Sequence, residues 1–133
     1  MNQIKKDISE KLAFQKQIAA QDKENKKVQL FVELLEEADL QIDNWIKSLE
    51  NLIDLAKHTD TTGGRVASEF LCSIYNGGRV PFDTRSLCSL DMSYWSDAIN
   101  VLKMDRLNIQ EIHYYIDNGS EIFKNILKKK KFS

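Results

Sequence analysis

The chain has 133 residues, a single proline and a formal net charge of −1. This length suits one domain that buries a real core without disulfide or metal staples, and 42% hydrophobic with 29% charged residues is ordinary for a globular protein. No apolar run approaches the roughly 18–20 residues of a membrane helix, and the N-terminus lacks the apolar segment of a secretory signal. We therefore expect a cytoplasmic protein.

Residues 1–25 predict a weak helix. Ile4, Ile8 and Leu12 fall on one line, Phe14 and Ile18 fall on another, and most other positions are polar or charged. A helix with so little apolar surface frays when it is alone. We expect the segment either to fold onto the next helix or to pair with another chain.

Residues 28–56 predict a long helix with one apolar side. The apolar positions alternate in steps of three and four residues, which is a heptad seam. No glycine or proline interrupts the segment, although Asp39 or Asp43 could cap a second helix if the chain breaks near them. The seam consists of Val28, Phe31, Leu35, Ala38, Ile42, Trp45, Leu49, Leu52 and Ala56.

Turn and cap signals divide the rest of the chain into short helices. Residues 58–64 are rich in Thr, Asp and Gly, and residues 76–78 (Asn-Gly-Gly) suit a left-handed helix C-cap. Asp83 and Asp91 are placed to cap the helices that follow them. An apolar residue directly precedes each aspartate, and a second apolar residue lies four positions after it. Further helical segments are predicted at 65–75, 91–104, 107–116 and 121–131, with a short helical turn between Asp83 and Asp91.

No useful segment alternates with the period of two that marks a strand. The sequence therefore predicts an all-α fold. Residues 1–57 form a long helical arm, and residues 58–133 form a compact helical domain of about four short helices.

The glycines of the chain are better explained by turns than by phosphate binding. A phosphate cradle places glycines at the start of a helix, usually after a strand. Gly77 and Gly78 instead follow a helix, and the glycines of residues 61–65 lack a preceding strand or a lysine. Helix caps and turns do not explain Arg79. We expect its side chain to be solvated, paired with a carboxylate, or in contact with a partner.

No pattern of catalytic or metal-ligating residues stands out. His58 and His113 are far apart and lack ligand partners at helical spacing, so neither a metal nor a cofactor is predicted. Cys72 and Cys88 are interpreted as reduced, buried residues. We expect that the protein is not an enzyme.

The net charge hides a segregated pattern. Residues 28–60 carry eight acidic residues and two lysines, whereas both ends of the chain are mildly basic. The ordinary explanation of the acidic helix is a solvated face; the alternative is a docking surface for a basic partner. The lysine run Lys128–Lys131 is more typical of a solvated tail than of a nucleic-acid contact, because the chain is not strongly basic. Candidate partner-binding residues are Glu33, Glu36, Glu37, Asp43, Glu50 and Arg79.

Residues 49–102 resemble an uncharacterised bacterial domain of unknown function, found mostly in proteins of integrative elements, plasmids and prophages. The pattern is a Leu-rich helix, a Thr/Gly turn, an Arg-x-Ala-x-Phe-Leu helix, an Asn-Gly loop, Phe-Asp, and two further aspartates before Val-Leu. Its positions here are Arg65, Ala67, Phe70, Leu71, Asn76, Gly77, Phe82, Asp83, Leu87, Asp91, Asp97, Val101 and Leu102. The resemblance implies a mobile-element context and no known chemistry.

These observations favour a non-catalytic, protein-binding accessory of a mobile genetic element. Its most concrete form is an anti-defence inhibitor, for example of a CRISPR effector, whose acidic helix occupies a nucleic-acid groove. One alternative is a structural or maintenance factor that forms a homodimer through the heptad seam. The other is a weak nucleic-acid binder that uses the basic termini.

Overall fold

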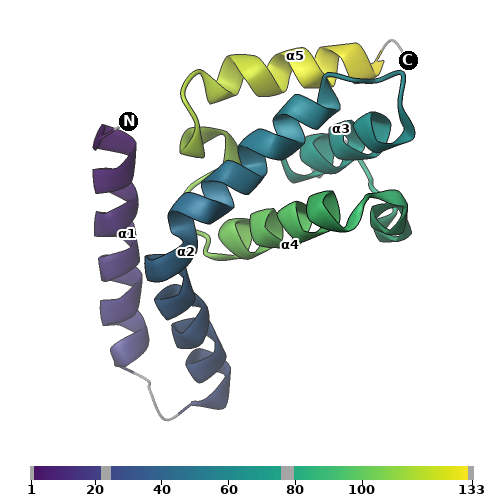
Figure 1. Cartoon of the computed structure of the whole chain (residues 1–133). Helices are drawn as coiled ribbons and strands as arrows, with labels where there is room; N and C mark the ends of the chain where they lie inside the picture. The colour runs from purple at the N-terminus through teal and green to yellow at the C-terminus, as the bar shows by residue number, and fades with distance from the viewer. Residues whose placement is uncertain (1, 22–24, 76–79, 132–133) are drawn as a thin grey trace.

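The all-α fold is confirmed by the computed structural model, which describes residues 2–21, 25–75 and 80–131. No strand occurs in these ranges. Figure 1 shows the chain as an arm of two helices joined to a bundle of shorter ones. The elements are α1 (Asn2–Ala20), α2 (Lys26–Ala56), α3 (Thr62–Tyr75), the 3₁₀ helix η1 (Thr84–Ser89), α4 (Met92–Arg106), the 3₁₀ helix η2 (Ile112–Tyr115) and α5 (Gly119–Lys131).

Helix α2 is the longest element and runs without a break. The side chain of Asn25 caps its N-terminus by accepting a hydrogen bond from the backbone N–H of Lys27 at 2.9 Å. Neither Asp39 nor Asp43 begins a new helix. The helix changes direction near its middle, so its first half points away from the bundle and its second half lies within it (Figure 1).

Helix α1 folds back along the first half of α2 in the same chain (Figure 1). Ile8 and Leu12, from the line predicted to be apolar, are buried. Phe14 and Ile18, from the second line, are exposed. The arm is thus a helical hairpin with one thin apolar contact.

The main core forms around the second half of α2. Trp45, Leu49 and Leu52 are buried there, and α2 packs most extensively against α4 and α3. Helix α5 closes the bundle over α3 and η2. The packing therefore places the second half of α2 with the C-terminal helices, on the other side of the boundary predicted at residue 57.

The caps of the shorter helices follow the prediction in part. Asp83 caps η1 by accepting a hydrogen bond from the backbone N–H of Arg85 at 3.0 Å. Asp91 occupies the N-cap position of α4 but makes no side-chain cap bond. The cap predicted at residues 76–78 lies outside the described residues.

The segment 107–116 forms less helix than its spacing of isoleucines predicts. Helix α4 ends at Arg106, and Asn108 adopts a left-handed conformation with φ of 55°, which turns the chain. Only the short η2 follows, and Asn118, also left-handed, redirects the chain into α5. The prediction of a helix over 107–116 is therefore wrong, because asparagine tolerates the left-handed geometry that stops α4 from continuing past Arg106.

Candidate functional site

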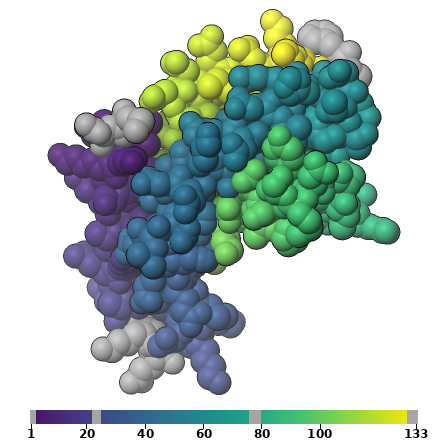
Figure 2. All heavy atoms as spheres, in the orientation of Figure 1, coloured from purple at the N-terminus to yellow at the C-terminus, as the bar shows by residue number. Residues whose placement is uncertain are grey.

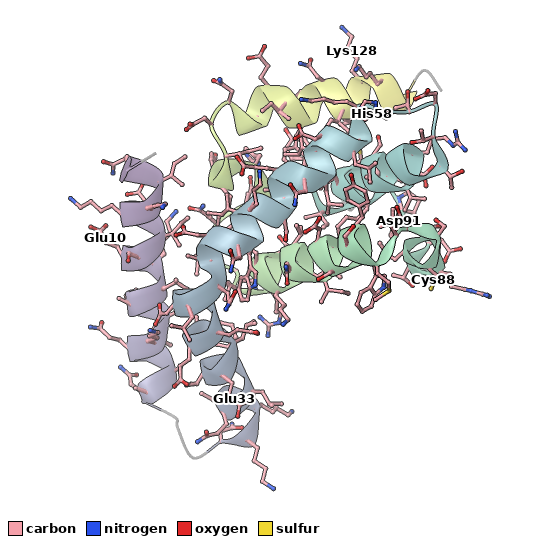
Figure 3. All side chains as sticks on the ribbon, in the orientation of Figure 1. Glu10, Glu33, His58, Cys88, Asp91 and Lys128 are labelled. Carbon is pink, nitrogen blue, oxygen red and sulfur yellow. The ribbon has the colours of Figure 1, made fainter. Side chains whose placement is uncertain are left out.

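Three of the predicted acidic residues form a line along α2. Glu36, Asp43 and Glu50 are each seven residues apart, so they project from one side of the helix, and all three are exposed. Glu33 lies off this line, near the free end of the arm, and is also exposed (Figure 3). We call Glu36, Asp43 and Glu50 the acidic line.

The remaining predicted residues have different surroundings. Glu37 follows Glu36 directly and therefore projects about 100° away from the acidic line. Its carboxylate accepts hydrogen bonds from Lys103 of α4 at 3.0 and 3.1 Å. Asp43 pairs with Lys5 of α1 at 3.4 Å, an ion pair in which both side chains stay more than half exposed. Arg79 lies outside the described residues.

Lysine side chains thus neutralise part of the predicted acidic face from within the chain. Asp39 also forms such a pair, with Lys16 of α1. Within the described ranges, Glu33, Glu36 and Glu50 have no ion pair and no side-chain hydrogen bond. These three carboxylates are the part of the predicted site that faces solvent unneutralised.

A groove runs beside the acidic line, between α1 and α2. One hollow of about 300 Å³ has Ile46, Tyr115 and Ile116 among its apolar lining, and Asp43 and Glu50 also line it. A second hollow of about 180 Å³ continues along α1 and shares the residues Lys5, Asp43 and Ile46 with the first. The arm therefore offers a partly apolar groove whose charged lining includes the carboxylates of Asp43 and Glu50 and the lysines Lys5 and Lys47.

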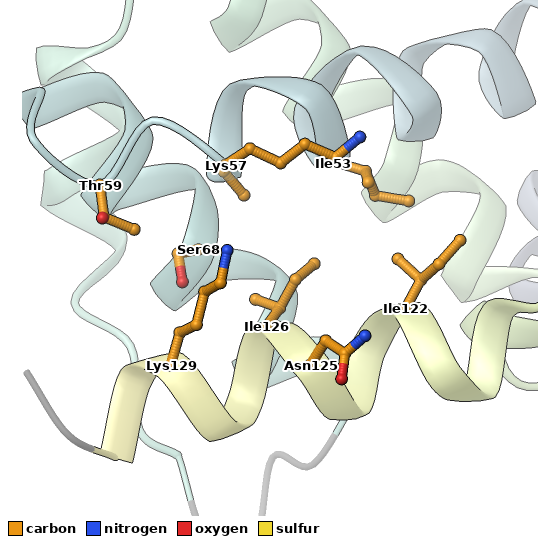
Figure 4. A pocket seen from close by; sticks show the side chains of 9 residues that line it. Ile53, Lys57, Thr59, Ser68, Ile122, Asn125, Ile126 and Lys129 are labelled. Carbon is orange, nitrogen blue, oxygen red and sulfur yellow. The ribbon is translucent and has the colours of Figure 1, made fainter.

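Another hollow, of about 200 Å³, lies between α2, α3 and α5 (Figure 4). Its lining is apolar apart from Lys57, Lys129 and a few uncharged polar residues. Both lysines lie at or next to the C-terminal ends of helices, where a cation offsets the negative end of the helix dipole. Lys57 also pairs with Asp54 at 3.3 Å. Helix-end electrostatics therefore explains these cations without a ligand.

The described residues contain no group of three or more His, Cys, Asp or Glu that could hold a metal ion. The ring of His113 packs against Tyr75 and Tyr114, with centroids 5.2 and 4.2 Å away, and its Nδ1 lies 3.7 Å from the Glu111 carboxylate. Its surroundings are therefore those of an aromatic packing residue.

The cysteines differ in environment. Cys72 is buried in α3, as predicted. Cys88 is exposed in η1 (Figure 3), so the prediction that both are buried is wrong. The reason is that η1 is a short 3₁₀ turn at the edge of the bundle, which buries Leu87 and leaves its neighbour in solvent.

A polar cluster joins α2 to α4. It gives Asp97 a structural role that its place in the sequence does not reveal. The Ser48 hydroxyl donates to the Asp97 carboxylate at 2.8 Å and accepts from the Asn100 amide at 3.0 Å. The Asn51 amide donates to the other carboxylate oxygen at 3.3 Å. Directional hydrogen bonds within an apolar interface fix how two helices are aligned. The signal was the position of Ser48 on the apolar side of the helix, three residues after Trp45 and four before Leu52.

Burial also perturbs two groups at the end of α4 and in η2. Desolvation raises the pKa of the Asp105 carboxyl group. Desolvation, and then the nearby Asp105 charge, raise the pKa of the Tyr115 hydroxyl. Tyr115 is buried and its hydroxyl has no hydrogen-bond partner within the described residues. These shifts come from burial in the protein core.

The family of unknown function DUF7673 matches residues 46–131. The chain belongs to this family. No curated protein and no solved structure matches the chain. The family match confirms the resemblance to an uncharacterised domain of unknown function and extends beyond the 49–102 segment on which that resemblance was based. In the described residues, no helix is long and apolar enough to cross a membrane.

The limits of the family match agree with the packing. The match begins within α2 and includes all of α3, α4 and α5, which is the unit built around the main core. Helix α1 and residues 26–45 of α2 precede it. Glu33, Glu36, Glu37 and Asp43 are therefore features of this chain outside the family segment, whereas Glu50 lies inside it.

Proposed function

We propose that this protein is a non-catalytic binding protein that docks on a basic surface of another protein. The observation that carries the proposal is the set of exposed carboxylates Glu33, Glu36 and Glu50 on a helix anchored by its opposite side. A partner that brings cations to these positions gains attraction without first breaking an ion pair inside this chain, and such complementary charge speeds encounter and selects the partner.

The shape of the arm also supports docking. Asp43 and Glu50 of the acidic line border the groove between α1 and α2, whose apolar lining can bury the aliphatic part of a lysine or arginine side chain while its charged end meets a carboxylate. Successive residues of the line are about 10 Å apart along the helix axis. A basic helix or an extended basic segment therefore fits along it.

The narrower form of the proposal is an accessory of a mobile genetic element. Its target is then a nucleic-acid-handling protein of the host, such as a CRISPR effector, and the acidic line occupies a groove that otherwise holds phosphates. The support is the charge of the line and the family context implied by the sequence resemblance.

A charge-reversal pair tests the proposal directly. The full chain is titrated with a fluorescent lysine- and arginine-rich peptide at low and at physiological ionic strength. Glu36→Lys with Glu50→Lys is compared with Asp60→Lys with Glu121→Lys, which changes the net charge equally at exposed positions away from the line. Glu37 and Asp43 stay unchanged, because reversing them would also break ion pairs within the chain.

We expect the first variant to lose about tenfold or more in affinity and the control to stay within about twofold, since only the first reverses charges on the acidic line. Equal weakening by both variants would mean that the peptide senses only net charge, and the acidic line would then have no special role. A nuclease-treated pull-down from host lysate with the same three proteins identifies the natural partner. Capture that persists in the first variant contradicts the proposal.

A further inference from the structure

The hollow of about 200 Å³ between α2, α3 and α5 has one apolar side (Figure 4). Ile53 of α2 and Ile126 of α5 line it, and they are 6% and 8% exposed. Ala56 and Ile122 complete this side. Figure 2 shows α5 (yellow) beside the end of α2 (teal) at the surface of the molecule, where a solute can reach both helices. An apolar hollow of this size can hold the hydrocarbon part of a small molecule, since a cavity of about 150 Å³ holds benzene.

Ser68 of α3 places a hydroxyl group without a partner in this hollow. The residue is only 4% exposed and lines the hollow, yet its hydroxyl group makes no hydrogen bond within the described residues. A serine inside a helix often bonds to a carbonyl group of the preceding turn, as Ser73 of the same helix does to Phe70 at 2.7 Å. Burial of a hydroxyl group without a partner costs free energy. Ser68 therefore needs a hydrogen-bond partner that the chain does not supply.

Lys129 brings a cation to the same hollow. In Figure 4 its side chain extends from α5 toward Ser68. Among the residues that the structure describes, Lys129 has no ion pair and no side-chain hydrogen bond, whereas Lys57 pairs with Asp54, and the lining includes no Asp or Glu. Helix-end electrostatics explains why a lysine occurs near the end of α5. It leaves the hydrogen-bond donors of Lys129 unused, and it does not explain Ser68.

The chemistry of these two polar groups favours a carboxylate. An ammonium group only donates hydrogen bonds and a hydroxyl group can donate one, so a ligand that meets both must accept two. A carboxylate has two acceptor oxygens, and its charge strengthens both hydrogen bonds. Water alone fits the hollow less well, because buried water needs several polar partners and much of the lining is apolar.

We propose that this hollow binds a small aliphatic carboxylic acid. The carboxylate accepts hydrogen bonds from the Ser68 hydroxyl group and the Lys129 ammonium group, and the hydrocarbon tail lies against Ile53 and Ile126. A tail of about five carbons matches the apolar side in size. A ligand with so few atoms binds weakly, with a dissociation constant on the order of 1 mM. The site does not depend on the proposed docking function, because none of its residues belongs to the acidic line.

Titration of the full chain with hexanoate at pH 7 and constant ionic strength, followed by amide NMR, tests the site. We expect saturable shifts at amides around the hollow. Acetate, which lacks the tail, and hexanamide, which lacks the charge, should bind at least about fivefold more weakly. The absence of saturable shifts overturns the proposal. Acetate that binds as tightly as hexanoate would mean an adventitious ion only, and hexanamide that binds as tightly would mean that the acid is not recognised; either result also overturns it.

Matched variants test the two polar groups. Ser68→Ala and Lys129→Gln each remove one hydrogen-bond donor and should weaken hexanoate binding about fivefold or more. Ser73→Ala and Lys128→Gln make the same chemical changes on the same two helices outside the hollow and should leave binding unchanged. Urea unfolding gives a second measurement, in which Ser68→Ala should not lower stability because its hydroxyl group bonds to no group of the described chain. A clear loss of stability in Ser68→Ala, or equal weakening of binding by the controls, contradicts the proposal.

Discussion

At the scale of single residues, Gly64 is the position with the least space for a side chain. A methyl group there would overlap the carbonyl oxygen of His58, because the loop after α2 folds tightly onto the first turn of α3. Two hydrogen bonds hold this approach: the Thr61 hydroxyl donates to that carbonyl at 2.8 Å and accepts from the Gly64 N–H at 2.9 Å. The turn signals of residues 58–64 thus predict a break in the helix, and the structure shows which glycine the break requires.

We predict opposite effects for two neighbouring substitutions. Gly64→Ala forces backbone apart and lowers the free energy of unfolding by about 2 kcal/mol or more. Gly63→Ala places its methyl group 3.7 Å from Leu55, an ordinary contact within a helix, and changes stability by no more than about 1 kcal/mol, in the stabilising direction. Urea unfolding measures both. Equal destabilisation by the two would show that the close approach to His58 is not the cause.

Asp105 is a carboxylate whose environment opposes its charge. Burial raises its pKa above the ordinary 3.8, and it lies in the last turn of α4, where the helix dipole disfavours a negative charge. Because the folded-state pKa is raised, the favourable contribution of Asp105 is complete below pH 3.8 and is lost as the pH rises through the folded-state pKa. At neutral pH the charged carboxylate therefore destabilises the fold.

We predict that Asp105→Asn stabilises the protein at pH 7 and that this advantage disappears as the pH falls below about 3.8. Thermal or urea unfolding of both proteins across this range measures it. Asp60→Asn, at an exposed carboxyl, serves as the control and removes no such penalty. A constant difference between Asp105→Asn and wild type at all pH values would contradict the argument.

At the scale of elements, helix α1 and the bundle differ in local stability. Helix α1 contacts the rest of the protein through a few buried residues, including Ile8 and Leu12, and through exposed ion pairs such as Lys5 with Asp43. Exposed ion pairs of this kind contribute only about 0–1 kcal/mol. Helix α1 should therefore open locally without unfolding of the bundle.

Native-state hydrogen exchange tests this difference. Leu12→Ala removes a side chain that is 3% exposed and should cost about 2–4 kcal/mol of protection, confined to the amides of α1 and the facing part of α2. Phe14→Ala, two residues away and 62% exposed, should change protection little. A loss of protection that extends equally through α3 and α4 would show that the arm and the bundle unfold as one unit.

Periodicity predicted the long helices well and the short ones less well. The seam at 28–56 was sufficient to place α2, which has 31 residues. Apolar residues that recur at steps of three and four over so long a segment fit an α-helix and do not fit a strand. The short segment 107–116 went wrong because one left-handed asparagine, Asn108, outweighs three isoleucines at helical spacing.

At the scale of the whole molecule, segregated charge dominates behaviour in solution. The net charge is −1 and the isoelectric point is about 6.1, yet the middle of the chain is acidic and its ends are basic. Near pH 6, molecules lack net repulsion and can align opposite patches. We predict that solubility is lowest near pH 6 and rises with added salt, as measured by light scattering. Loss of solubility on adding salt would instead implicate the exposed apolar residues.

For the candidate site, the sequence predicts the residue types but not which of them form ion pairs. The sequence shows which residues of α2 are acidic, but ion pairs depend on segments distant in the chain. Lys103 reaches Glu37 from 66 residues away, and Lys5 reaches Asp43 from 38 residues away. One-dimensional spacing contains no information on these contacts, so it could not separate the neutralised carboxylates from those that remain open.

Because α2 is unbroken, helical phase couples the arm to the bundle. One residue inserted near position 41 would rotate everything before it by about 100° and advance it by about 1.5 Å. This would carry Glu37 away from Lys103 and turn Glu36 out of line with Asp43 and Glu50. Seven inserted residues would nearly restore the phase and lengthen the arm by about 10 Å. The length of the arm can therefore change only in steps of about two helical turns if the orientation of its side chains relative to the bundle is to be kept.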